Sequence, residues 1–194
     1  IATMFEHYYF ADLGLVATND GYAYVTDDQL YAVDIHDPAN MRIVGTTSGL
    51  RPHLLISDNI AYTGNYLDLQ IVDVANPSQP QLLAEYTVFE TGDFGSYLVD
   101  DDLATIDGRH ILVYAGQSRG VVMLDVTDPT NIVSLPGLPD YWAAEVTVNG
   151  NLLYVQAAGD QMHTLPADGL FLYDISQPER PLLISDALQN IDIK

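Results

Sequence analysis

One stretch of this sequence occurs four times, and it constrains the fold more than any other feature. Each copy is a short apolar run that ends in Asp, continues with one apolar residue and reaches Pro four positions after the Asp. The four pairs are Asp34 with Pro38, Asp73 with Pro77, Asp125 with Pro129 and Asp174 with Pro178. The chain is therefore built from four copies of one structural unit.

The apolar run predicts a strand that is buried on both faces. In the second copy, Leu69 and Ile71 point to one side while Val72 and Val74 point to the other. Apolar residues on both faces indicate a strand between two packed layers. The proline that follows ends the strand, because it fixes φ and lacks an N–H group for the ladder.

The polar residues of the repeat predict tight turns at the strand exit. Asp37, Asn76 and Asp128 stand just before proline, where each can close an Asx turn on its own backbone. The aspartate that ends each strand is unusual, because a buried carboxylate without partners costs several kcal/mol, roughly. We expect it to accept backbone N–H groups of the turn beyond it, in a structural rather than a catalytic role.

A second strand precedes each of these runs and is introduced by a turn signal. The strands are expected at 21–25, 59–63, 111–115 and 151–155, after turns at 19–21, 57–59, 107–108 and 149–150. Asn-Gly and Asp-Gly steps between apolar residues are strong signals for a hairpin. One strand before each turn and one after each proline would complete a four-stranded unit.

Repeats of roughly 40–50 residues with four strands each are typical of β-propeller blades. We therefore predict an all-β fold in which residues 1–194 form a single β-propeller domain or a propeller fragment. The expected blades are about 8–48, 49–90, 91–139 and 140–188. Segments 88–102 and 156–168 interrupt the regular unit, as loop insertions at a propeller rim or as functionless drift.

Residues 69–83, with the sequence Leu-Gln-Ile-Val-Asp-Val-Ala-Asn-Pro-Ser-Gln-Pro-Gln-Leu-Leu, resemble the LVIVD repeat. The first and third copies depart from it, since Met41 and Ile132 replace its second proline. The resemblance implies a bacterial or archaeal β-propeller, secreted or attached to the cell surface, that serves adhesion or assembly rather than catalysis. It also implies more than four blades, so that this chain would be part of a larger propeller; a closed four-bladed ring is the alternative.

The composition excludes several classes of protein. Hydrophobic residues make up 48% of the chain, which excludes general disorder, and no apolar run approaches the ~20 residues of a membrane helix. Acidic residues outnumber basic ones 27 to 6, which gives a net charge of −21 and excludes nucleic acid as a partner. Such a charge favours an extracellular or cell-surface location, with the periplasm as an alternative. The absence of cysteine leaves the compartment open.

Aromatic and charged residues before the first strand of each blade are the candidate binding residues, because propeller loops converge there near the axis. Aromatic residues and arginine favour a binding surface, and a protein or a surface glycan is the expected partner. Tyr141 and Trp142 could instead pack between blades. The candidates are Arg51, His53, Tyr97, Asp101, Tyr141 and Trp142.

The sequence holds no motif of a known catalytic or metal centre. Asp100-Asp101-Asp102 could bind Ca²⁺ but lacks the alternating spacing of a calcium loop, so a solvated acidic turn is the competing interpretation. The five histidines are scattered, and no Gly-x-Ser-x-Gly motif exists. We expect a non-enzymatic interaction module without a cofactor. The alternative is a propeller hydrolase of glycans or lactones that uses acids near the axis, such as Glu90 or Glu145.

Overall fold

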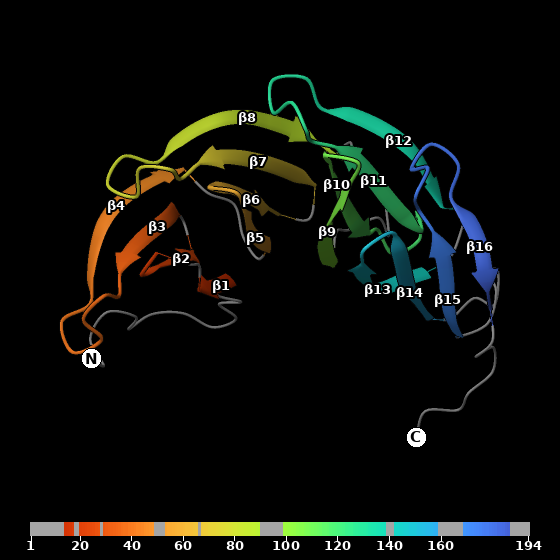
Figure 1. Ribbon diagram of the computed structural model, residues 1–194, viewed down its shortest axis with the longest axis horizontal. Helices are drawn as coiled ribbons and strands as arrows, with labels where there is room; N and C mark the ends of the chain where they lie inside the picture. Colours follow the sequence, from red (N-terminus) through yellow and green to blue (C-terminus); the bar gives the residue numbers. More distant parts are fainter. Residues whose placement is uncertain are drawn as a thin grey trace. The chain divides into compact units, whose positions relative to one another are not determined.

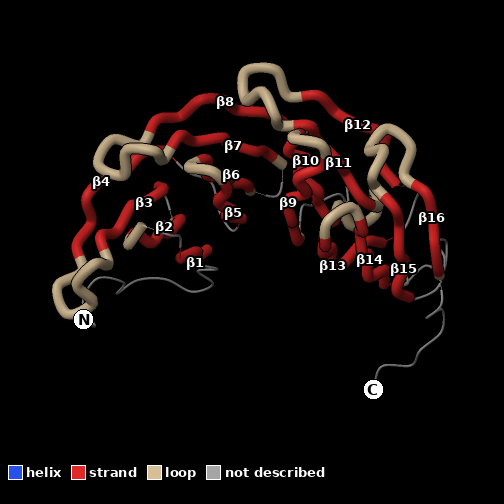
Figure 2. The backbone as a smooth tube through the Cα atoms, in the orientation of Figure 1, coloured by secondary structure: helices blue, strands red, loops and turns tan. Residues whose placement is uncertain are grey.

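The computed structural model describes residues 14–17, 20–27, 29–48, 53–65, 67–89, 99–138, 142–158 and 169–186. In these ranges, sixteen strands form four four-stranded antiparallel sheets, each with its strands in chain order (Figures 1 and 2). The predicted all-β fold of four-stranded units is confirmed. The strands are β1 (Gly14–Ala17), β2 (Tyr22–Thr26), β3 (Gln29–Asp34), β4 (Arg42–Ser48), β5 (His53–Ser57), β6 (Ile60–Gly64), β7 (Asp68–Asp73), β8 (Gln81–Thr87), β9 (Asp100–Ile106), β10 (Arg109–Ala115), β11 (Val121–Asp125), β12 (Val133–Leu138), β13 (Trp142–Asn149), β14 (Leu152–Ala158), β15 (Gly169–Asp174) and β16 (Leu182–Ser185).

The chain divides into two compact units. The first comprises Ile1–Asn65 with Gln70–Leu82, and the second comprises Tyr66–Leu69 with Leu83–Lys194. In the first unit β1 lies beside β5, and in the second β9 lies beside β13, so neighbouring sheets meet at their first strands. The described residues contain no helix long and apolar enough to cross a membrane. The blade boundaries proposed for the complete chain, and its treatment as a single domain or a fragment, stay predictions.

The predicted hairpins between the first and second strands are present. Asp58 and Asn59 both have positive φ, 48° and 65°, as do Asp107 and Gly108, 50° and 78°. These are the left-handed conformations that a two-residue turn of type I′ requires. The turn signals in the sequence therefore set the register of the first two strands, with Ser57 opposite Ile60 and Ile106 opposite Arg109.

The aspartate that ends the third strand of each sheet has the expected structural role. Its Oδ1 accepts the backbone N–H of the residue two positions later in all four copies. The N–O distances are 3.1 Å for Asp34, 2.8 Å for Asp73, 3.0 Å for Asp125 and 2.8 Å for Asp174. Because every copy makes this bond, the prediction is confirmed.

The residue before the first proline of the exit loop also acts as predicted. Asp37, Asn76 and Asp128 each accept, through the side chain, the backbone N–H of the residue two positions later, at 3.0, 3.2 and 2.9 Å. Their backbone carbonyls accept a further N–H one residue beyond, each at 2.9 Å. The Asx turns predicted for these three loops are confirmed.

Two apolar clusters hold neighbouring sheets together, one in each unit. In the first unit, Tyr24, Leu30 and Ala32 of one sheet cluster with residues of the next. In the second unit, β10 and β11 cluster with β14 and β15. The partners in the first cluster are Leu54, Ala61, Val72 and Val74; the main members of the second are Ile111, Val113, Val121, Met123, Leu153, Val155, Phe171 and Tyr173.

Candidate functional site

The clearest candidate surface in the described part of the chain lies where β9 and β13 begin, in the second unit. We call it the β9–β13 rim. It carries two half-buried aspartates from β9, a half-buried tryptophan and an exposed glutamate from β13, and an exposed arginine from the loop after β10. Its members are Asp100, Asp101, Arg119, Trp142 and Glu145.

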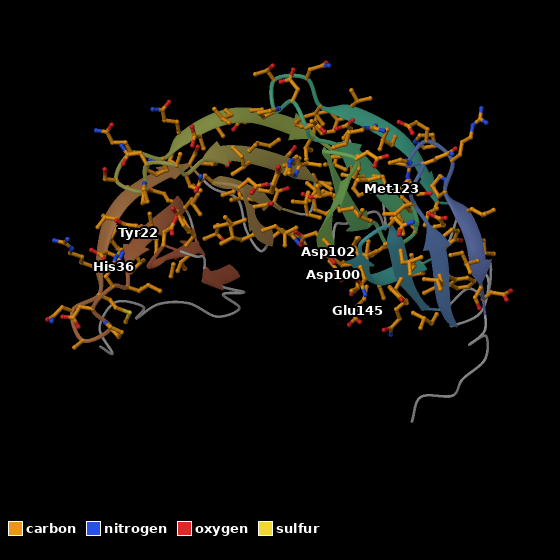
Figure 3. The ribbon with its side chains drawn as sticks, viewed as in Figure 1. Tyr22, His36, Asp100, Asp102, Met123 and Glu145 are labelled. Atoms are coloured by element: carbon orange, nitrogen blue, oxygen red, sulfur yellow. The ribbon has the colours of Figure 1, made fainter. Side chains whose placement is uncertain are left out.

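Two aspartates of β9 bind the backbone of β13. Strand alternation places Asp100 and Asp102 on one side of β9, and Figure 3 shows them with Glu145 on the two neighbouring strands. The Val146 N–H donates to Asp100 Oδ2 at 2.8 Å, and the Val148 N–H donates to Asp102 Oδ2 at 2.7 Å. The carboxylates thus satisfy peptide groups on the side of β13 that does not pair with β14.

This geometry corrects the interpretation of residues 100–102 as a solvated acidic turn. The three residues begin strand β9 and are half-buried. The insertion predicted at 88–102 therefore includes the start of a strand. The sequence suggested a turn because three consecutive aspartates are rare in strands, but the backbone of a second sheet supplies the N–H groups that make them acceptable here.

The electrostatics of the rim follow from this partial burial. Burial raises the pKa of Asp100, and the nearby charges of Asp101 and Glu145 raise it further. The N–H donors of Val146 and Asp101 act in the opposite direction without cancelling the effect. A proton on Asp100 is therefore held more tightly than on an ordinary aspartate.

The loop after β10 is closed by backbone hydrogen bonds and lies against β13. The Gly116 N–H donates to the Gly120 carbonyl at 2.7 Å, and the Gly120 N–H donates to the Gln117 carbonyl at 2.9 Å. The Ala143 N–H then donates to the same Gln117 carbonyl at 3.0 Å, beside Trp142. This bridge ties the loop that carries exposed Arg119 to the start of β13.

The residues selected from the sequence fall into two groups. Trp142 and Asp101 lie on the β9–β13 rim, whereas His53 is buried at the first position of β5, in the other unit. The rim therefore brings together two of the six candidates. Arg51, Tyr97 and Tyr141 lie outside the described residues.

The sequence does not predict Arg119 and Gln117 as site residues. The available signal was the spacing Gly116-Gln-Ser-Arg-Gly120, a five-residue loop bounded by glycines directly after a predicted strand. That signal predicts a turn, but not its contact with a strand that begins 22 residues later, at Trp142.

The arrangement favours recognition over chemistry. Asp100 and Asp102 accept backbone N–H groups, so both have a structural task. Within the described ranges, no three His, Asp or Glu side chains come together in a way that could hold a metal ion. The rim carries a half-buried tryptophan and an exposed arginine, two residue types enriched in protein-binding surfaces.

Comparison with known proteins supports the repeat and the fold. The family model described as the LVIVD repeat matches residues 14–48 and 53–88, which contain β1–β4 and β5–β8. No curated protein matches the sequence. The resemblance seen in the sequence is thus confirmed, with two of the four predicted copies matched.

Solved structures resemble this chain at low sequence identity. The crystal structure of the N-terminal domain of Nup159 aligns with a TM-score of 0.52 and 14% identity, over 84% of this chain and 45% of that one. Nup159 in a complex with S. cerevisiae Dbp5, Gle1, IP6 and ADP aligns with a TM-score of 0.49 and 15% identity, over 84% and 44%. This chain therefore spans less than half of the structures that it resembles, and the first likeness agrees with a β-propeller fold.

Proposed function

Starting from the premise that this chain carries LVIVD repeats in β-propeller sheets, we propose that it is a non-enzymatic module that binds a protein partner through the β9–β13 rim. The observation that carries the proposal is the Gln117–Ala143 bridge, which joins the loop that carries Arg119 to the start of β13, where Trp142 lies. Both side chains project from backbone held by hydrogen bonds, so little backbone entropy is lost on binding. The exposed carboxylate of Glu145 at the same rim favours a partner surface with a positive charge.

The test compares single variants of the rim with a variant elsewhere on the same unit. The immobilised chain is incubated with extract of the native cells, and captured proteins are quantified by mass spectrometry. A partner should be retained by the wild type and by Ser134→Ala, a change on exposed β12, and lost with Arg119→Ala and Trp142→Ala. With the purified partner, calorimetry should show a loss of affinity of at least about tenfold for either rim variant.

Thermal melting separates binding from folding in this experiment. Arg119 is exposed, so Arg119→Ala should leave the melting temperature unchanged while it weakens binding. Equal capture by all four proteins would reject the rim as the binding surface. Loss of capture only in variants with lowered melting temperatures would also reject it.

We further propose that the module works outside the cell or at its surface. The support is the net charge of −21 and the LVIVD resemblance. Fractionation of the native cells with an antibody against the chain should find it in the medium, in the surface fraction or in the periplasm. Recovery with cytoplasmic marker proteins would contradict the location but not the binding proposal.

The alternative function, a hydrolase of glycans or lactones, has one observation in its favour. Asp100, whose pKa is raised, lies close enough to Glu145 for the two charges to interact. An acid of raised pKa beside a second carboxylate is the arrangement that glycoside hydrolysis requires. A screen that finds turnover abolished by Glu145→Gln would favour this function. A large fall in the melting temperature with EDTA would add a bound cation such as Ca²⁺ to it.

A further inference from the structure

Equivalent positions in the four sheets follow from strand pairing. The Asp that ends the third strand lies opposite Tyr22 in the first sheet, Ile111 in the third and Leu152 in the fourth. Counting from these pairs gives each sheet two faces. We call forward the face that carries the Asp, the second-strand residue opposite it and every second residue along these two strands. The rear face carries the residues in between.

Four forward-face residues of β10 and β11 are completely buried, but the equivalent residues of β14 and β15 are not. Ile111, Val113, Val121 and Met123 are each 0% exposed; Met123 is labelled in Figure 3. At the equivalent positions of the fourth sheet, Leu170 is 37% exposed and the other three residues are half-buried. The forward face of the fourth sheet is Leu152, Tyr154, Leu170 and Leu172.

The packing of the third sheet shows what a forward face contacts in this chain. Its forward face packs in one cluster with the rear face of the fourth sheet, including Leu153, Val155, Phe171 and Tyr173. The first unit repeats the arrangement, since Tyr24 and Leu30 of the first sheet cluster with Ala61 and Val72 of the second. A forward face in this chain therefore packs on the rear face of another sheet.

The rear face of the first sheet has the matching properties. It carries Ala23, Val25, Tyr31 and Val33; Ala23 is 9% exposed and the other three are half-buried. The equivalent rear residues of the fourth sheet are between 0% and 3% exposed. The rear face of the first sheet and the forward face of the fourth sheet are thus more exposed than the equivalent faces of the fourth and third sheets.

The side-chain sizes on these two faces are complementary. In the first unit, the large forward residue Tyr24 clusters with the small rear residue Ala61, and its hydroxyl donates to the Val74 carbonyl at 3.2 Å. Tyr154 occupies the position of Tyr24 in the fourth sheet, and Ala23 occupies the position of Ala61 in the first. The carbonyl equivalent to that of Val74 belongs to Ile35.

We propose that the forward face of β13–β16 binds the rear face of β1–β4 of a second copy of this chain. The contact continues the interface that already joins the sheets within each unit, with Tyr154 on Ala23 and the Tyr154 hydroxyl donating to the Ile35 carbonyl of the second copy. Because two different faces meet, the association is head-to-tail. Its strength rises with salt, since two chains of net charge −21 repel each other.

The first experiment measures mass in solution. Light scattering after gel filtration, at about 100 µM chain and about 0.5 M salt, should give at least twice the mass of one chain. Leu170→Lys on the forward face and Val25→Lys on the rear face should each give the mass of a monomer. Val133→Lys, at a 45% exposed position on outer strand β12, is the matched control and should associate like the wild type.

Mixing the two variants tests the head-to-tail geometry. Leu170→Lys keeps an intact rear face and Val25→Lys keeps an intact forward face, so an equimolar mixture should recover a dimer that neither variant forms alone. Tyr154→Phe removes only the hydroxyl and should weaken association severalfold without changing the melting temperature of the single chain.

Three outcomes would overturn the proposal. If the wild-type chain stays monomeric under these conditions, the two faces do not bind a second copy, and further repeats would be the candidates to cover them. Loss of association with Leu170→Lys but not with Val25→Lys would indicate contact between two forward faces. A mixture that fails to recover the dimer, while both variants melt cooperatively near the wild-type temperature, would exclude the head-to-tail contact.

Discussion

At the scale of single residues, the aspartate before each exit loop shows how one carboxylate organises a turn. Asp34 accepts from the His36 backbone N–H at 3.1 Å and from His36 Nδ1 at 2.8 Å, and Arg42 donates to its second oxygen at 3.1 Å. His36 in turn lies edge-on to Tyr22, with ring centroids 5.2 Å apart (Figure 3). The backbone bond recurs in every copy, whereas the side-chain partners differ.

The difference in partners predicts a difference in stability among the copies. Asp125 accepts the Thr127 N–H at 3.0 Å and two donors of Arg109, at 3.0 and 2.8 Å. Asp125→Ala should therefore destabilise the fold by about 2 kcal/mol. Asp73→Ala, which removes the 2.8 Å bond from the Ala75 N–H, should cost about 1 kcal/mol. Urea unfolding measures both, and equal losses would contradict the role assigned to Arg109.

The same aspartates predict loss of stability in acid. Hydrogen bonds from His36 and Arg42 lower the pKa of Asp34 from 3.8 to about 2. For Asp125, the donors Thr127 and Arg109 outweigh burial and lower the pKa, and Ser176 lowers that of Asp174. Below pH ~4 the unfolded chain binds more protons than the folded one, so the melting temperature should fall as pH falls from about 4 to about 2. A flat profile over that window would contradict the hydrogen bonds.

The ionised form of Asp100 should destabilise the fold, in contrast to the ionised forms of Asp34, Asp125 and Asp174. Its pKa is raised by burial and by neighbouring acids, so its charge at neutral pH opposes folding. Asp100→Asn removes the charge but keeps an oxygen that can accept the Val146 N–H, and it should raise the melting temperature at neutral pH. At a pH below the ordinary pKa of aspartate, the variant and the wild type should melt alike. Strong destabilisation at neutral pH would show that the charge itself is needed.

At the scale of elements, the outer strand β4 of the first sheet closely approaches the exit loop of the second sheet. A Cβ atom built on Gly45 of β4 would overlap the Pro77 carbonyl and lie 2.9 Å from Pro80 Cδ. Both prolines belong to the exit loop of the second sheet, in the same unit. Gly45 therefore permits a backbone contact that any larger residue would block.

Substitution of this glycine should be more costly than substitution of a turn glycine. Gly45→Ala should destabilise the fold by about 2–3 kcal/mol, because backbone must move to admit the methyl group. Gly108 has a φ of 78° but open space around its Cβ position, so Gly108→Ala should cost only about 1 kcal/mol. Chemical denaturation of the two variants gives the comparison. If Gly45→Ala loses less stability than Gly108→Ala, the exit loop that carries Pro77 and Pro80 can move to admit the methyl group at little cost.

The strands were predictable because their signals are local. Hairpins appeared where Asp-Gly or Asp-Asn stood between apolar runs, and strand exits appeared at each Asp-Pro-like step, since turn chemistry depends on a few adjacent residues. The strand at residues 100–102 was not predicted, because the contacts that stabilise it are not local. Their partners, Val146 and Val148, lie 46 residues away, on a strand of another sheet.

At the scale of the whole molecule, the charge determines how the protein responds to salt. With 27 acidic and 6 basic residues, we expect repulsion between like charges to outweigh ion pairs such as that of Arg109 with Glu179 at 2.7 Å. Raising salt from about 0.05 M to about 1 M should therefore raise the melting temperature by on the order of 5 °C. Calorimetric scans check this. A decrease would mean that the ion pairs contribute more than the repulsion removes.

By itself, the sequence determined the number of repeats, most of the strands within each one and the Asx turns at three of the four exits. These depend on residues near one another in the chain, and fourfold repetition made the pattern unambiguous. Only the tertiary structure decided that Asp100 and Asp102 bind β13, that the loop of Gln117 contacts Ala143, and which apolar faces remain partly exposed. Those outcomes require one sheet to be packed against the next, and no local pattern specifies which groups then come within hydrogen-bonding distance.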